Sequence, residues 1–274
     1  MPLPDNFQFS QNNLQDYRDC ARRFQLRYIL HQEWPAVQSE PVLKTEQLIE
    51  LGQNFHRLVL QIHSGIPEET ITASIKDVEL ETLWLNYLRN GPARHEQQTK
   101  AEFTLSIPFA GFRLIARYDL LMFKPDSKFL IYDWKTSQKQ PKQEFMLQRM
   151  QSKVYPFVIA TTGYPLAEPV LPENIEMIYW YPYHPETPTT FSYSAQQQKK
   201  DRSELEEMAK EIQVIREPIF PLTMDLSKCK YCTYRSLCER GEKAGNLDEF
   251  EDMDSIQPDQ GWDLDFENLE EIAF

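Results

Sequence analysis

No apolar stretch of this 274-residue chain approaches the length that a helix needs to cross a bilayer. The first six residues also lack the basic and then apolar pattern of a secretory signal. These absences predict an intracellular, cytoplasmic protein without a membrane partner. In such a reducing compartment the four cysteines are not expected to form disulfides, so their spacing needs another explanation.

The chain also lacks an excess of positive charge, because its formal net charge is −13. The acidity is concentrated in one segment. Residues 239–274 contain 13 acidic and 2 basic side chains, a net charge of −11, which leaves about −2 for residues 1–238. The body of the protein is therefore nearly neutral and can hold basic patches around an acidic site.

We expect one large globular domain over residues 1–240 and a tail over residues 241–274. Acidic residues dominate this tail, and aromatic and aliphatic residues interrupt them. That composition predicts a flexible, solubilising segment. The alternative is a docking segment that occupies a basic groove and restrains the site in the body.

The first third of the chain has the apolar periodicity of helices, at residues 13–30, 45–63 and 73–89. Considered alone, Cys20 is expected to be a small buried apolar residue and His56 a half-buried, hydrogen-bonded histidine.

The periodicity then changes to that of strands, at residues 101–109, 112–123 and 128–136. A three-residue loop between the last two strands would place Asp119 directly opposite Asp133, with Cβ atoms about 5 Å apart on one face. Two carboxylates at that separation repel each other unless a cation lies between them. The hairpin therefore predicts a cation site, in a register that a loop one residue longer would destroy.

The strand over residues 129–136 ends with an acid, a single spacer and a lysine. Because alternate side chains of a strand share a face, Asp133 and Lys135 should point the same way and Trp134 the opposite way. A carboxylate can hold a divalent cation while a neighbouring lysine orients or deprotonates a water, which is the minimum chemistry for metal-assisted attack on a phosphodiester. By itself such a triplet is more often solvated surface.

The helical period returns over residues 142–161, where Gln151 and Tyr155 share a face. The simplest interpretation of that face is a polar helix edge. Residues 176–181 predict another strand, and the capping box at residues 203–206 predicts the start of the last helix.

The spacing of Cys229, Cys232 and Cys238 is a strong signal. Two thiolates two residues apart can bind one metal centre, and a third just beyond provides another ligand. A tetrahedral or cubane site needs four ligands, and the only other cysteine is Cys20. Four cysteines would then form one site that links the N-terminal helix to the C-terminal end.

In chain order, these residues resemble the motifs of the PD-(D/E)XK nucleases of the RecB type. The resemblance covers about residues 8–240 and is closest to the iron–sulfur branch, which contains the AddB C-terminal nuclease and the CRISPR-associated RecB-like exonucleases. The matching motifs are Tyr17-Arg-Asp-Cys20, Gly52-Gln-Asn-Phe-His56, Ala116-Arg-Tyr-Asp119, Asp133-Trp-Lys135, Gln151-Ser-Lys-Val-Tyr155 and the cysteine triplet.

The resemblance implies a restriction-endonuclease-like α/β core, with a central mixed β-sheet flanked by helices, an N-terminal helical part and a cysteine-ligated C-terminal end. It implies that His56, Asp119 and Asp133, with the carbonyl of Trp134, hold Mg²⁺ or Mn²⁺. Lys135 would position or activate the attacking water. The other implied site residues are Gln151 and Tyr155 along the DNA, and Cys20, Cys229, Cys232 and Cys238 around a [4Fe–4S] cluster, with Zn²⁺ as the alternative.

The implied function is a metal-dependent DNA nuclease, an exonuclease on single-stranded DNA or DNA ends in repair, recombination or CRISPR adaptation. Its expected partners are DNA and a helicase or a CRISPR integrase. The alternative is a non-catalytic, DNA-binding scaffold subunit of such a complex, although degenerate relatives usually lose an acid or the lysine and this chain keeps them. Glu102 falls where relatives often carry a glutamate, and we assign it no role from the sequence.

Overall fold

The computed structural model of the protein describes residues 3–33, 42–92, 98–124, 128–162, 170–230 and 232–241. The predicted acidic tail lies outside these residues except for its first position. Within the described ranges, no helix is both long and apolar enough to cross a membrane.

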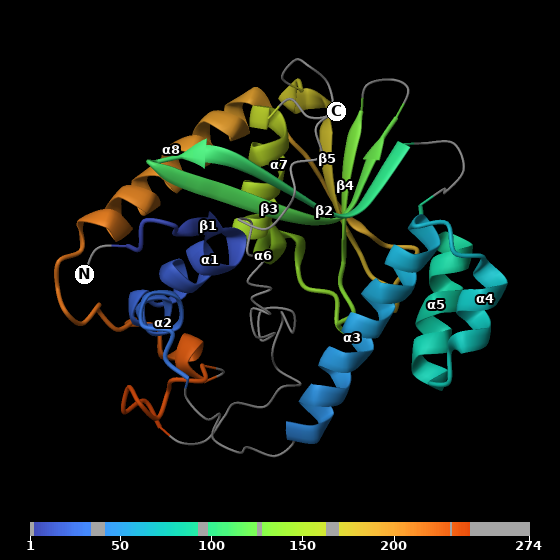
Figure 1. The fold of residues 1–274 in the computed structure, drawn as a ribbon, viewed down its shortest axis with the longest axis horizontal. Helices are drawn as coiled ribbons and strands as arrows, with labels where there is room; N and C mark the ends of the chain where they lie inside the picture. Colours follow the sequence, from blue (N-terminus) through green and yellow to red (C-terminus); the bar gives the residue numbers. More distant parts are fainter. Residues whose placement is uncertain are drawn as a thin grey trace.

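A six-stranded mixed sheet forms the centre of the molecule, with helices on both of its faces (Figure 1). Its strand order is β1 (Gln8–Ser10), β3 (Phe112–Phe123), β4 (Phe129–Trp134), β5 (Ile175–Trp180) and β6 (Thr189–Ser192), and β2 (Gln98–Phe109) also pairs with β3. The β1–β3 and β4–β5 pairs are parallel, and the remaining pairs are antiparallel. This architecture confirms the expected α/β fold.

The helices form two groups that pack on opposite faces of the sheet (Figure 1). One group consists of α3 (Val42–His63), α4 (Glu68–Ser74) and α5 (Val78–Asn90). The other consists of α1 (Gln11–Asp19), α2 (Ala21–Phe24), α6 (Gln143–Gln148), α7 (Met150–Thr162) and α8 (Ala195–Val214). Short helical turns are η1 (Gln25–Ile29), η2 (Pro172–Asn174) and η3 (Leu226–Cys229).

The expected helices differ from the observed ones in four places. One is the stretch 142–161, where the extended backbone of Arg149 separates α6 from α7. The helix predicted over residues 13–30 is interrupted at Cys20, whose backbone is extended with φ −165° and ψ 110°. The stretch 73–89 is the end of α4 followed by α5. The last helix begins well before the predicted capping box, because Ser194 accepts a hydrogen bond from the third helical N–H and good helix formers follow it.

The β3–β4 hairpin has the register that the sequence predicts. Its described ladder runs to Leu120 opposite Tyr132, and Asp119 and Asp133 come next along that register. β4 lies in the middle of the sheet, between β3 and β5. The two acids are therefore at the centre of the fold, as expected.

Aromatic rings fix α3 and α5 against the sheet. Phe55 is fully buried and stacks on Trp180, with ring centroids 6.3 Å apart and ring planes 10° apart. Trp134 meets Trp180 edge to face at 5.8 Å, and Tyr87 of α5 contacts all three rings. Because His56 follows Phe55 in α3, this packing also sets the position of the histidine.

The Phe55→Ala substitution should lower the free energy of unfolding by about 3–5 kcal/mol, because it leaves a cavity between α3 and the sheet. Urea denaturation followed by circular dichroism measures the change. Val78→Ala is the control, since Val78 is 75% exposed and its truncation should change stability by less than about 0.5 kcal/mol. A Phe55→Ala effect as small as that of the control would contradict this account.

Candidate functional site

The long β2–β3 hairpin is irregular at one pair of residues, Glu102 and Asp119. Tyr118 packs into the core beside α7, whereas Leu120 packs into the core beside α3, although alternate residues of a regular strand share a face. The register is the same on both sides of the irregularity, and both strands change direction sharply near their middle (Figure 1). Glu102 has φ +48°, in the left-handed region. Such strain costs about 1–3 kcal/mol and is concentrated at functional sites.

His56, Glu102 and Asp119 converge at this irregularity. They form the one group in the described part of the chain that brings three ligand atoms of His, Cys, Asp or Glu within 4.8 Å of one another. The Nδ1 atom of His56 lies 3.6 Å from Asp119 Oδ1 and 3.9 Å from Glu102 Oε1. All three side chains are partly exposed, so an ion can reach them. An imidazole with two carboxylates suits Mn²⁺ well and Mg²⁺ acceptably.

Charge within this group is balanced through His56. Burial by itself would lower the pKa of His56, but the carboxylates of Asp119 and Glu102 outweigh it and hold that pKa well above its usual 6.5. Burial would likewise raise the pKa of Asp119, but His56, the backbone N–H of Trp134 and the charge of Lys135 lower it. The Trp134 N–H donates to Asp119 Oδ2 at 2.8 Å. The protonated imidazole therefore supplies the positive charge that these acids need.

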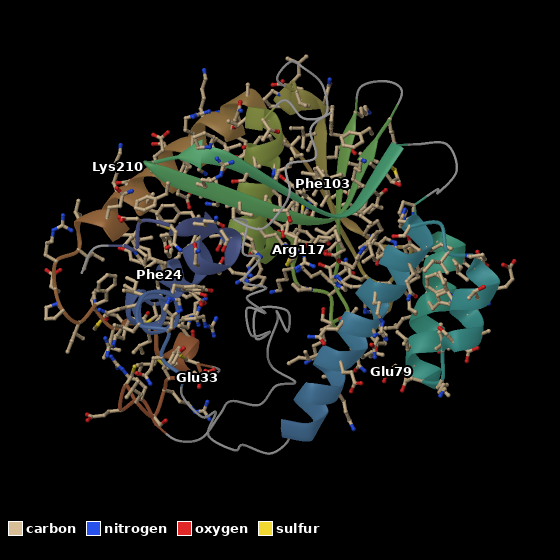
Figure 2. All side chains as sticks on the ribbon, viewed as in Figure 1. Phe24, Glu33, Glu79, Phe103, Arg117 and Lys210 are labelled. Atoms are coloured by element: carbon tan, nitrogen blue, oxygen red, sulfur yellow. The ribbon has the colours of Figure 1, made fainter. Side chains whose placement is uncertain are left out.

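Glu102 is held from both sides. Its Oε2 atom accepts a hydrogen bond from Nε of Arg117 at 2.9 Å and lies 2.8 Å from Nη2, while Oε1 faces His56. Arg117 lies beside the middle of the long hairpin (Figure 2). The sequence carries a signal for the position of Glu102. The turn at residues 110–111 fixes the β2–β3 register, and that register places Glu102 opposite Asp119.

Asp133 lies outside the three-residue group, although the resemblance implies it as a metal ligand. Its Oδ2 atom lies 2.9 Å from Nζ of Lys135, which confirms that these two side chains share a face. Its Oδ1 atom accepts a hydrogen bond from Nε2 of Gln151 at 2.5 Å. Lys135 thus compensates the charge of Asp133, as His56 compensates that of Asp119. The roles of Asp133 and of the Trp134 carbonyl as metal ligands stay predictions.

Gln151 and Tyr155 of α7 lie buried beside the two acids, Asp119 and Asp133. Both are buried, with 9% and 4% of their area exposed. Burial raises the pKa of Tyr155 well above its usual value, and the charges of Asp133 and Asp119 raise it further. The helix face that carries Gln151 and Tyr155 is therefore buried, and the simplest interpretation from the sequence, a polar helix edge, is wrong. DNA contact by these two residues stays a prediction.

The combined arrangement has the parts that phosphodiester hydrolysis requires. His56, Glu102 and Asp119 could hold a divalent cation, and Lys135 directly follows β4, with its ammonium group fixed by Asp133. A divalent cation neutralises charge on a phosphate and lowers the pKa of a water, while a lysine can orient that water. The structure therefore brings the predicted histidine, acids, lysine and Gln151 into one region.

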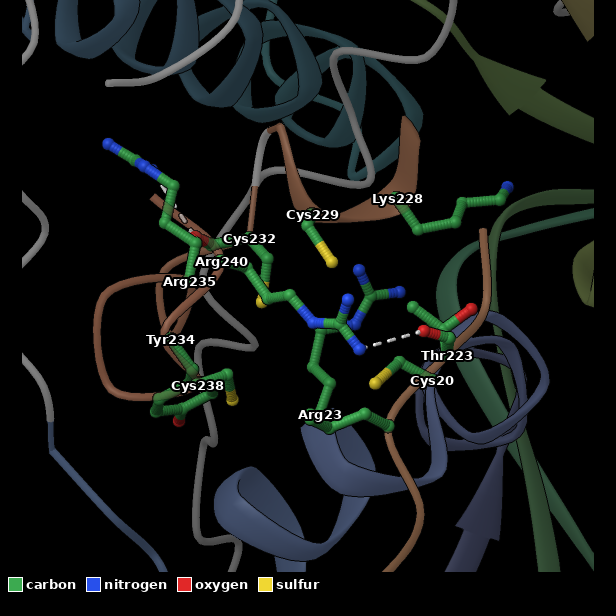
Figure 3. Close-up of a pocket in the computed structure, with 11 residues that line it drawn as sticks. Cys20, Arg23, Thr223, Lys228, Cys229, Cys232, Tyr234, Arg235, Cys238 and Arg240 are labelled. Atoms are coloured by element: carbon green, nitrogen blue, oxygen red, sulfur yellow. Dashed lines mark hydrogen bonds between the residues drawn. The ribbon is translucent and has the colours of Figure 1, made fainter. Parts of the chain in front are cut away.

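All four cysteines line a second site, a pocket between the N-terminal helices and the segments 222–229 and 232–240 (Figure 3). Cys20 follows α1, and Cys229, Cys232 and Cys238 come from the C-terminal end, as the spacing predicts. All four are free thiols. No three of their sulfur atoms lie within 4.8 Å of one another, since the histidine–carboxylate group alone meets that distance among the described residues.

The cysteine pocket is strongly basic. The cationic side chains that line it are Arg23, Lys228, Arg235 and Arg240. Burial raises the pKa of the three C-terminal thiols, neighbouring thiols raise it further, and arginines of the pocket oppose the shift. A metal centre that converts the thiols to thiolates would therefore find its negative charge offset by the surrounding cations.

A family model described as the PD-(D/E)XK nuclease superfamily matches residues 8–239, from β1 to just beyond the last cysteine. The search of curated proteins gives no match. Among solved structures, the chain is similar to SSO0001, with 14% identity, 87% of this chain and 88% of that chain covered, and a TM-score of 0.38. It is also similar to a protein from Eubacterium rectale whose name proposes an exonuclease, with 10% identity, 76% and 80% covered, and a TM-score of 0.46.

Mn²⁺ binding should release a proton, and the apparent affinity should rise with pH, because the elevated pKa of His56 keeps it protonated until a metal displaces the proton. Calorimetric titration in buffers of different ionisation enthalpy measures this release. His56→Gln should abolish the release and weaken binding by at least about tenfold. The control is His184→Gln, which alters a histidine bonded to the Gln138 carbonyl. Unchanged proton release in His56→Gln would contradict the assignment.

Proposed function

Because the chain belongs to the PD-(D/E)XK nuclease superfamily, we propose that it is a metal-dependent deoxyribonuclease, an exonuclease on single-stranded DNA or DNA ends. The observation that carries the proposal is a pair of acids on neighbouring strands, each with its own cationic partner. Asp119 pairs with His56, and Asp133 pairs with Lys135. The setting in repair, recombination or CRISPR adaptation, and a helicase or integrase partner, stay predictions of the sequence resemblance.

Each residue of the site has a task in this proposal. His56, Glu102 and Asp119 hold Mg²⁺ or Mn²⁺, which supplies charge neutralisation at the phosphate and a water of lowered pKa. Lys135 orients that water by donating a hydrogen bond from its ammonium group. Asp133 fixes the Lys135 ammonium group from one oxygen, and Gln151 fixes Asp133 through the other.

We also propose that the chain belongs to the iron–sulfur branch of the family and that its four cysteines hold a [4Fe–4S] cluster. A zinc ion with Zn–S bonds of about 2.3 Å in tetrahedral geometry needs sulfur atoms only about 3.8 Å apart. No three of the four sulfur atoms come within even 4.8 Å of one another, an arrangement that favours a larger centre over a single zinc ion. The basic lining of the pocket supports a group that carries a net negative charge with its four thiolates.

Asp133→Ala and Lys135→Ala should each reduce Mn²⁺-dependent degradation of end-labelled single-stranded DNA by about 10²–10⁴-fold. Each removes one partner of the buried pair next to the proposed metal site. Lys139→Ala, in the loop that follows, is the control and should keep activity. Circular dichroism checks that each variant is folded.

Undiminished cleavage by both variants would overturn the catalytic assignment. A wild-type protein that binds DNA but cuts it with neither Mn²⁺ nor Mg²⁺ would favour the scaffold alternative.

Protein purified without oxygen should be brown and absorb near 400 nm if a [4Fe–4S] cluster fills the pocket, whereas zinc would leave it colourless. Iron, sulfide and zinc analyses complete the measurement. Cys232→Ser should remove the absorbance, and His56→Gln, which alters the other site, should leave it unchanged. A colourless protein that contains one zinc per chain would contradict the cluster.

A further inference from the structure

Gln15 of α1 joins two helices that are far apart in the sequence. Its side chain is buried, and its Oε1 atom accepts a hydrogen bond from the backbone N–H of Met150 at 3.0 Å. Met150 is the first residue of α7, where the helix leaves its first N–H groups without partners inside the helix. Gln15 therefore caps the N-terminus of α7 from another element.

The residue after Met150 reaches the proposed catalytic site. Gln151 donates from Nε2 to Asp133 Oδ1 at 2.5 Å, and Asp133 holds Lys135 at 2.9 Å. Since Gln151 is on the first turn of α7, a shift of that turn moves its amide relative to Asp133. The position of α7 therefore controls the orientation of the acid and, through it, of the lysine.

The other end of the Gln15 amide points to the cysteine pocket. Its Nε2 atom donates to Asp19 Oδ1 at 3.2 Å, and Lys228 Nζ lies 3.0 Å from the same oxygen. Asp19 precedes Cys20, and Lys228 precedes Cys229. One carboxylate thus contacts both ends of the chain that contribute cysteines.

We propose that Gln15 is a positioning residue that couples the cysteine pocket to Asp133. The contacts run from Lys228 through Asp19, Gln15 and the start of α7 to Gln151 and the acid. A metal centre bound by the four cysteines holds Asp19 and Lys228 in place and so keeps the first turn of α7 ordered. The catalytic consequence rests on the proposed nuclease function, whereas the coupling itself does not.

Two variants separate the two ends of the Gln15 side chain. Gln15→Ala removes both the acceptor for the Met150 N–H and the donor to Asp19. Gln15→Glu keeps an acceptor for Met150 but replaces the donor to Asp19 with a carboxylate oxygen that repels it. The matched control is Gln213→Ala, which removes another hydrogen bond between elements, from Gln213 Nε2 to the Ala110 carbonyl at 3.0 Å.

Amide hydrogen exchange at residues 150–155 is the primary measurement, on anaerobically purified full-length protein before and after removal of its metal centre with a chelator. In the wild type, removal should speed exchange by about 5- to 150-fold. In Gln15→Ala, the amides of residues 150–155 should already exchange at this faster rate with the metal centre present. Removal of the metal centre should then change their exchange rate little. Gln15→Glu should stay protected and no longer respond to removal, and Gln213→Ala should behave as the wild type.

Turnover on DNA is the second measurement. Gln15→Ala should lower kcat by about tenfold with little change in KM and with the metal absorbance retained, and Gln15→Glu should restore kcat. Exchange in Gln15→Ala that still rises on metal removal as in the wild type would overturn the coupling. If the nuclease proposal is wrong, the wild-type protein will not cleave DNA. The hydrogen-exchange results would still decide whether Gln15 couples the cysteine pocket to α7.

Discussion

Two acids at the centre of the sheet set the constraint on which the rest of this structure depends. Asp119 and Asp133 lie on neighbouring strands, and like charges so close together repel in a poorly solvated site. Each acid is stabilised by its own cation, His56 or Lys135. His56 is supplied by α3 on one face of the sheet, whereas α7 on the other face supplies the amide that orients Asp133. The charge of Asp119 is therefore balanced only when α3 is in place, and Asp133 is oriented only when α7 is in place.

The sequence predicts the parts of the site that local geometry controls. Short turns fix the register of each hairpin, and the alternation of strand side chains puts Asp133 and Lys135 together. The left-handed backbone of Glu102 was beyond prediction, because tertiary packing imposes it on a residue without such a preference. The break at Cys20 is similar, since the extended backbone there accompanies a turn toward a pocket completed two hundred residues later. Hydrogen bonds between helices, such as Gln15 to Met150, depend on packing that periodicity does not specify.

The two sites differ in how the fold uses them. The histidine–carboxylate group is partly open and suits an ion that meets a substrate, whereas the cysteine pocket joins elements that share no strand pairing. Arg23 illustrates the second role, because it lines the pocket and also forms ion pairs with Asp16 and Asp19 of α1. The pocket therefore belongs to the same network of charges that joins α1 to α2.

The origin of the cysteines from both ends of the chain also orders events during synthesis. Cys20 leaves the ribosome long before Cys238, and at about 5–20 residues per second the interval is about 10–40 seconds. During that time β1 can pair with β3 as soon as β3 has been synthesised. The thiol of Cys20, in contrast, has no complete cysteine pocket until the last cysteine is made. A nascent chain thus carries an accessible thiol, open to oxidation, until its last cysteine appears.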